Sequence, residues 1–231
     1  MKLPTFQRLN RYTFEMIVIL VFISLYDLLL SDALSIPVAL RMSQWMALRS
    51  LDHLVSSLEL LLPLNILVLM AVLWLAGRNH WERRLALAYL GWVTLRLILK
   101  VALVIVIASD SKIVKAPILL KDTFVLFFII SVLFGVWYWM IDGGGPQARR
   151  DGQVKRCDFS FPQQFQPTPG WEDWQPGLWD YIFLGFSGST QFSPGNSNVY
   201  SARAKLLLML QVSLSLLILV FLASFAISLL K

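Results

Sequence analysis

Long apolar runs alternate with short polar segments along most of this chain. Runs rich in Leu, Val, Ile and Phe occupy residues 13–30, 54–76, 85–108, 123–141 and 204–230. At 1.5 Å per residue, a helix of about 20 residues crosses the roughly 30 Å hydrocarbon core of a bilayer. The pattern therefore predicts an all-α membrane protein with about five transmembrane helices.

Three other segments depart from this pattern. Residues 32–52 alternate apolar and polar positions, with Arg41, Trp45 and Arg49 among Leu and Met, which favours an amphipathic helix at the membrane interface. The Gly-Gly-Gly-Pro run at 143–146 predicts a stop to the fourth helix. Residues 147–178 are polar and rich in Pro, Gln and Trp, so they predict the largest loop.

The stretch from Trp179 to Lys205 predicts a re-entrant segment before the last helix. It begins with about a dozen mostly apolar residues, too few to cross a bilayer as a helix. A turn signal, Ser-Pro-Gly-Asn at 193–196, follows, and then comes the final apolar run. Non-helical backbone at membrane depth survives only where protein or a water-filled cavity covers it. This pore-loop-like segment is therefore the best candidate for a functional site.

The predicted organisation has two parts. Residues 1–136 would hold the N-terminal membrane helices, namely three spans, most of a fourth and the interfacial helix. Residues 137–231 would form a channel-like region with the end of the fourth helix, the polar loop, the re-entrant segment and the last helix.

Composition supports a membrane protein and excludes several other classes. The chain has 231 residues, of which 57% are hydrophobic and 15% charged, whereas soluble domains carry roughly a quarter charged residues. The net charge of +6 lies at the borders of apolar runs, which favours membrane-border placement over nucleic-acid binding. One cysteine excludes an internal disulfide, and no Cys or His spacing predicts a metal site. The distribution of Lys and Arg favours a cytoplasmic N-terminus.

Four ionisable residues are expected at membrane depth, and each is costly there unless it is paired or faces a cavity. They are Asp27, Glu59, Arg96 and Lys100. Arg96 and Lys100 share one helix face, so an interhelical ion pair with Glu59 is the favoured interpretation. A voltage-sensing or ion-relay role is the alternative, but two basic residues are few for a sensor.

The re-entrant segment has the composition of a pore loop. Residues 180–186 could form a short helix whose C-terminal dipole points at an ion path, and oxygens of the following turn could replace water around the ion. The candidate pore residues are Ser187, Gly188, Ser189, Thr190, Gln191, Phe192 and Ser193. In the last helix, Gln211 and Ser215 share a face that either lines a pore or packs against a neighbouring helix.

The sequences Y-I-F-L-G-F-S-G-S-T-Q-F-S-P-G-N and A-R-A-K-L-L-L-M-L-Q-V-S-L-S-L resemble a group of uncharacterised bacterial membrane proteins with a potassium-channel-like C-terminal half. Y-W-M-I-D-G-G-G-P at 138–146 and D-F-S-F-P-Q at 158–163 are similar to two further segments of that group. The resemblance covers residues 137–230 and implies a multi-pass protein of the bacterial inner membrane. Ser189 to Pro194 departs from the Thr-x-Gly-Tyr-Gly type of potassium filter.

The leading hypothesis is an ion-channel-like protein that conducts monovalent cations through an oligomeric pore, a homotetramer by analogy with channels. The alternative is a non-conducting membrane scaffold in which the re-entrant segment only packs against its neighbours. An enzyme is disfavoured, because no catalytic constellation, phosphate-binding loop or cofactor motif is present in the sequence. The expected partners are the lipid bilayer, monovalent cations and further copies of the chain, and not nucleic acid.

Overall fold

The computed structural model describes residues 79–108, 116–150, 152–154, 156–165, 169–170, 172 and 174–228, together with single residues at 18, 21, 65, 68, 69 and 72. The chain divides into two units, Met1–Asp122 and Thr123–Lys231, each of which is described by itself. The predicted division at residues 136/137 stays a prediction. Predicted elements at residues 13–30, 32–52 and 54–76 lie outside the described residues, apart from the single positions named.

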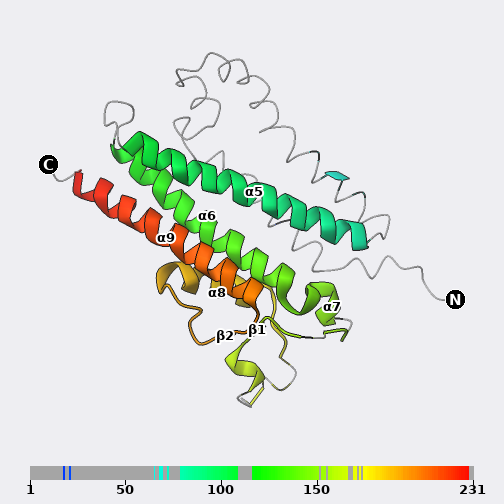
Figure 1. The fold of residues 1–231 in the computed structure, drawn as a ribbon. Coiled ribbons are helices and arrows are strands. Elements are labelled where there is room, and N and C mark those ends of the chain that lie inside the picture. Colours follow the sequence, from blue (N-terminus) through cyan, green and yellow to red (C-terminus); the bar gives the residue numbers. More distant parts are fainter. Residues whose placement is uncertain are drawn as a thin grey trace. The chain divides into compact units, whose positions relative to one another are not determined.

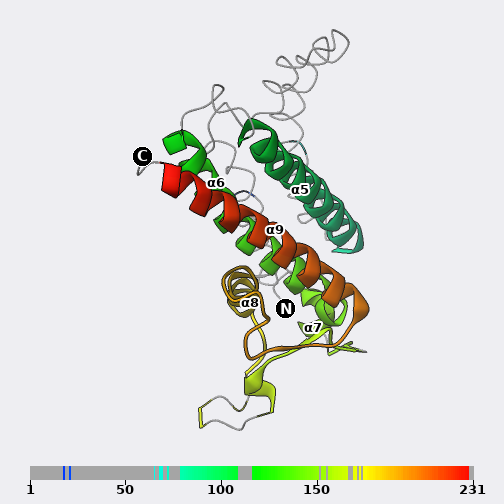
Figure 2. The same cartoon turned by 60° about the vertical axis from the view of Figure 1, so that its left-hand side comes forward.

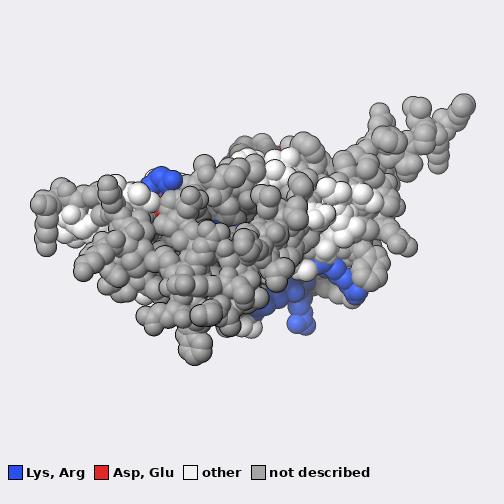
Figure 3. Space-filling model, turned by 90° about the horizontal axis from the view of Figure 1, so that it is seen from above, with Lys and Arg blue, Asp and Glu red and all other residues white. Residues whose placement is uncertain are grey.

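Within the described residues, three helices are long and apolar enough to cross a membrane. They are α5 (Asn79–Ala108), α6 (Ala116–Ile141) and α9 (Ala202–Ser228), all visible in Figure 1. Among the described residues that can be seen in Figure 3, most of the charged side chains are Lys or Arg, in line with the net charge of +6. The helical class and these three long helices are therefore confirmed.

The predicted helix starts were wrong in two places. α5 begins at Asn79 instead of Leu85, and α6 begins at Ala116 instead of Thr123. In both cases charged residues interrupt the apolar run, but a helix needs no apolar residues in a terminal turn. Pro117 suits the first turn of α6, because an N–H there has no partner within the helix.

The predicted stop after the fourth helix is confirmed. α6 ends at Ile141 and leads into a short 3₁₀ turn, η4 (Asp142–Gly144), and then α7 (Pro146–Arg150). The φ angles are +59° at Gly143, +93° at Gly144 and +99° at Gly145. Residues other than glycine rarely adopt such φ angles, so the three glycines allow the backbone to turn sharply here.

A small antiparallel sheet, absent from the sequence-based prediction, joins the loop after α7 to the segment before α9. β1 (Phe159–Ser160) pairs with β2 (Asn198–Val199), with Phe159 opposite Val199. The Tyr200 amide also donates to the Asp158 carbonyl at 2.9 Å. The pairing therefore holds the start of α9 beside the polypeptide that leaves α6.

A shorter helix, α8 (Leu178–Thr190), packs on α6 and α9. Figure 2 looks almost along α8 while α9 runs obliquely across the view, so the two helices cross at an angle. Glycines allow close approach to α6: a methyl group on Gly185 would lie 2.8 Å from the Gly135 nitrogen, and one on Gly135 would lie 2.7 Å from the Ile182 Cα. Small residues at a helix contact permit this backbone-to-backbone packing.

Candidate functional site

The candidate pore residues are divided between a helix and a turn. The sequence predicts a helix over residues 180–186 only, but α8 continues to Thr190, so residues 187–190 are helical. The Ser187 carbonyl accepts the Gln191 amide at 2.8 Å, and the Thr190 hydroxyl donates to the Phe186 carbonyl at 2.9 Å. The turn was therefore predicted four residues too early, and the backbone from Ser187 to Thr190 does not form an extended row of carbonyls.

The chain leaves the helical conformation just after Gln191, which caps α8. Phe192 has a φ of +54°, the left-handed conformation that commonly ends helices, and it is the one residue other than glycine with positive φ among those described. The predicted turn at residues 193–196 is confirmed as non-helical, with Gly195 at a φ of +61° and the Ser197 amide donating to the Pro194 carbonyl at 3.2 Å.

Four side chains form a buried hydrogen-bonded group between α6, α8 and α9, called here the glutamine–serine network: Tyr138, Ser189, Gln211 and Ser215. Gln211 Nε2 donates to the Ser189 hydroxyl at 2.8 Å and also to the Gly185 carbonyl. The Tyr138 hydroxyl donates to Gln211 Oε1, and the hydroxyls of Ser215 and Ser189 lie 3.0 Å apart.

This network uses both amide donors of Gln211 and one of the two acceptor sites on its oxygen. Its amide group donates twice and accepts once, and a methyl group on Gly188 would lie 2.9 Å from its oxygen. Buried polar groups at membrane depth need such partners, because no water replaces them. Within one chain, Ser189, Gln211 and Ser215 thus act in helix packing, and pore lining by Gln211 and Ser215 stays a prediction.

A second group, the acid–arginine cluster, lies where α6 ends and α9 begins: Asp142, Arg149, Asp158, Tyr181 and Arg203. Asp142 Oδ1 accepts the backbone amides of Asp158 at 2.6 Å and Phe159 at 3.2 Å, and Oδ2 accepts the Tyr181 hydroxyl at 2.5 Å. Arg149 donates to the carbonyls of Asp142 at 2.5 Å and Trp139 at 3.0 Å. Asp142 is therefore the point that fixes β1 and α8 to the end of α6.

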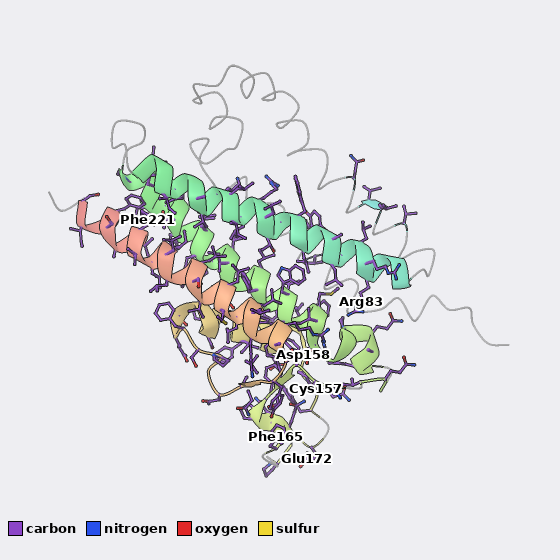
Figure 4. The ribbon with its side chains drawn as sticks, viewed as in Figure 1. Arg83, Cys157, Asp158, Phe165, Glu172 and Phe221 are labelled. Atoms are coloured by element: carbon purple, nitrogen blue, oxygen red, sulfur yellow. The ribbon has the colours of Figure 1, made fainter. Side chains whose placement is uncertain are left out.

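Asp158 connects the same cluster to α9, as Figure 4 shows near the start of that helix. Arg203 binds it with two hydrogen bonds, Nε to Oδ1 at 2.8 Å and Nη2 to Oδ2 at 2.5 Å, and also donates to the Ile141 carbonyl at 3.0 Å. Burial alone would raise the pKa of Asp158, but the hydrogen bonds to the carboxylate hold its pKa below the ordinary value.

The sequence pattern does not single out the acid–arginine cluster as a site. Asp142 lies in the predicted helix stop, Asp158 in the loop and Arg203 at a membrane border, where each residue type has an ordinary explanation. The one signal that could have pointed to these residues was the family resemblance, because the segments that carry it contain Asp142, Asp158 and Arg203.

Two of the four predicted intramembrane charges, Arg96 and Lys100, lie among the described residues. Asp27 and Glu59 lie outside the described residues. Arg96 and Lys100 are both buried on one face of α5, with 4% and 3% of their surface exposed. The ion pair proposed with Glu59 stays a prediction.

A cavity of about 220 Å³ opens between α8 and the turn that follows it. One face of α8 lines it with Asp180, Phe183, Ser187 and Gln191, and residues 161–163 and 195–197 form the other walls. None of the described lining residues is Lys or Arg. Among the residues that the structure describes, no group of His, Cys, Asp or Glu is arranged to hold a metal ion.

These features define a helical protein with three described helices long and apolar enough to cross a bilayer, and with a short helix packed against two of them. No protein-family model, curated protein or solved structure matches this chain.

Proposed function

We propose that this chain is an ion-channel-like membrane protein whose residues 123–231 form a pore module. In this proposal α6 and α9 cross the bilayer, α8 enters it from one side, and the chain returns to that side before α9 begins. Further copies, four by analogy with channels, would surround a path for monovalent cations. The resemblance of residues 137–230 to potassium-channel-like bacterial proteins adds the bacterial inner membrane as the expected location.

The observation that carries the proposal is the course of α8. Its first turn contacts the end of α6, through Tyr181 and Asp142, and its last turn contacts Ser215, near the middle of α9. At 1.5 Å per residue, Ser215 lies about 20 Å along α9 from Ala202. The chain then returns to β2, which pairs with β1 near the end of α6. A helix that descends and a chain that comes back to the same end are what a re-entrant segment requires.

The outer face of α8 suits a membrane environment. Trp179 and Phe183 expose 78% and 68% of their surface, and Phe186 exposes 41%. These positions follow the helical period and form an aromatic strip that soluble surfaces seldom carry without a partner. Lipid or a neighbouring copy of the chain would cover it.

The proposed constriction is the non-helical turn at residues 191–197, since residues 187–190 are helical. Gln191, Ser193 and Asn196 there carry oxygens that can replace water around a cation, and the C-terminal dipole of α8 points toward them. Because the turn lacks the glycine pattern of a potassium filter, we expect weak discrimination between Na⁺ and K⁺.

The second candidate is a non-conducting membrane scaffold. The specific observation in its favour is the glutamine–serine network, in which Ser189, Gln211 and Ser215 are all buried and bonded to one another. In a scaffold, these residues would only hold α8 against α9.

Ion flux into liposomes that contain the purified protein distinguishes the two. We expect K⁺ and Na⁺ uptake with the wild type and at least a tenfold loss with Gln191→Leu, because the substitution removes an oxygen at the constriction. Gln175→Leu, the same change at an exposed position before α8, should conduct normally. Folded, inserted wild-type protein that passes no ion under any gradient or voltage supports the scaffold and overturns the channel.

A further inference from the structure

The cavity beside α8 combines one carboxylate with neutral oxygen groups. Asp180 lies at the end of the cavity nearest the N-terminus of α8, and Ser187 and Gln191 follow along the same helix face. A methyl group on Gly195 would lie 3.7 Å from the Ser187 hydroxyl oxygen and 3.9 Å from the Gln191 amide oxygen. Both oxygens therefore face one point across the cavity, and a cation is the ligand that such groups prefer.

We propose that this cavity binds a hydrated monovalent cation, held by the charge of Asp180 and by the oxygens of Ser187 and Gln191. The role of the site rests on the proposed function: cations would gather here at the entrance to the constriction, which shares Gln191 with the cavity. Binding itself needs no conduction.

Geometry explains why the cation would keep its water. Asp180 and Gln191 are eleven positions apart in sequence, which is about 16 Å along a helix, so no bare ion can touch both. A volume of about 220 Å³ holds about seven waters at roughly 30 Å³ each, enough for an ion with part of its hydration shell. The attraction is therefore mainly electrostatic, and Na⁺ and K⁺ should bind alike.

The carboxylate keeps part of its capacity for a ligand. Its Oδ2 accepts the Gly177 amide at 2.7 Å, and two carboxylate oxygens together can accept about four hydrogen bonds or cation contacts. Burial raises the pKa of Asp180 above its ordinary value, as expected for a carboxylate with little compensating positive charge. At a separation of about 8 Å, one such charge concentrates a monovalent cation between about twofold and about thirtyfold, depending on the local dielectric.

Thermal unfolding in detergent tests the binding without any measurement of flux. KCl or NaCl would replace N-methyl-D-glucamine chloride at constant ionic strength. We expect the midpoint of the wild type to rise with either small cation, and Asp180→Asn to need about threefold to thirtyfold more of it for the same shift. The asparagine oxygen still accepts the Gly177 amide, so α8 should form normally. Glu172→Gln removes an exposed carboxylate outside the cavity and should behave like the wild type.

The outcomes separate this inference from the proposed function. A midpoint insensitive to K⁺ and Na⁺, or an equal response in the wild type and Asp180→Asn, overturns the cation site. A response that Glu172→Gln also loses overturns it too, because the effect would then follow net charge. If the site behaves as expected but liposomes show no flux, the cavity stands and the channel falls. If liposomes show flux but Asp180→Asn binds cations as the wild type does, the channel stands and the cation site falls.

Discussion

The acid–arginine cluster is built from charged side chains, whereas the glutamine–serine network between α8 and the middle of α9 is built from neutral ones. Both connect α6, α8 and α9. Asp142 and Asp158 lie at the ends of the helices, beside the loop. Their neighbour there, the Arg203 side chain, is 58% exposed. Burying a charge costs several kcal/mol more than burying an amide or hydroxyl. In these two groups, the charges thus lie at the ends of the helices, and the neutral groups lie deeper along α9.

The comparison implies different sensitivities to substitution, because the two sites leave different groups unsatisfied. Asp142 accepts two backbone amides and one hydroxyl, so its loss strands several donors at once. Gln211 has partners on two side chains and one carbonyl, and a membrane-like unfolded state also offers partners to such groups.

The largest expected effect is therefore that of Asp142→Ala. The side chain is 3% exposed, and its removal leaves the amides of Asp158 and Phe159 without an acceptor. We expect the free energy of unfolding in mixed detergent to fall by about 3–5 kcal/mol. Asp142→Asn keeps one acceptor oxygen and should lose about half as much. A loss below about 1 kcal/mol for Asp142→Ala would mean that the cluster does not fix β1 and α8.

Gln211→Leu should cost less, about 1–2 kcal/mol, in the same measurement. Leucine is close in size, but it leaves the Tyr138 hydroxyl and the Ser189 hydroxyl with one partner fewer. Ser213→Leu is the matched control, since Ser213 is exposed on the other face of α9, and it should change stability by less than about 0.5 kcal/mol. If Gln211→Leu proved more damaging than Asp142→Ala, the proposed order of the two sites would be reversed.

The sequence allowed prediction of the three long helices, and the physical reason is local. A run of apolar residues long enough to cross a bilayer carries its own signal, and the glycines after Ile141 carry another. The helix starts at Asn79 and Ala116 were missed because charged residues end an apolar run before they end a helix.

The end of α8 and both polar groups depend on contacts between distant parts of the chain. Ser187 to Thr190 contains weak helix formers, and hydrogen bonds from Gln211 and Ser215 to Ser189 stabilise the helix there. Asp158 and Arg203 are 45 positions apart with α8 between them, and nothing in the pattern around either residue predicts that they meet. The pore role of residues 187–193 therefore stays a prediction, and the structure corrects only the conformation of Ser187 to Thr190, which are helical.

Acid should weaken the charged site and spare the neutral one, which is the smallest effect expected here. Hydrogen bonds from Arg203 lower the pKa of Asp158 in the folded state, against the effect of burial. The unfolded carboxyl titrates near its ordinary value of about 4. A group whose pKa is lowered in the folded state stabilises the fold at pH values above its unfolded pKa. That contribution is lost as the pH falls through the folded pKa.

The advantage of the wild type over Asp158→Asn should therefore be constant from pH 7 to about 5 and shrink below about 4. Gln211→Leu has no titrating group at the substituted site, so its deficit relative to the wild type should not shrink over the same range. Unfolding midpoints of the three proteins between pH 7 and 3 give the comparison, and a wild-type advantage over Asp158→Asn that grows in acid would show that Arg203 does not stabilise the ionised carboxylate.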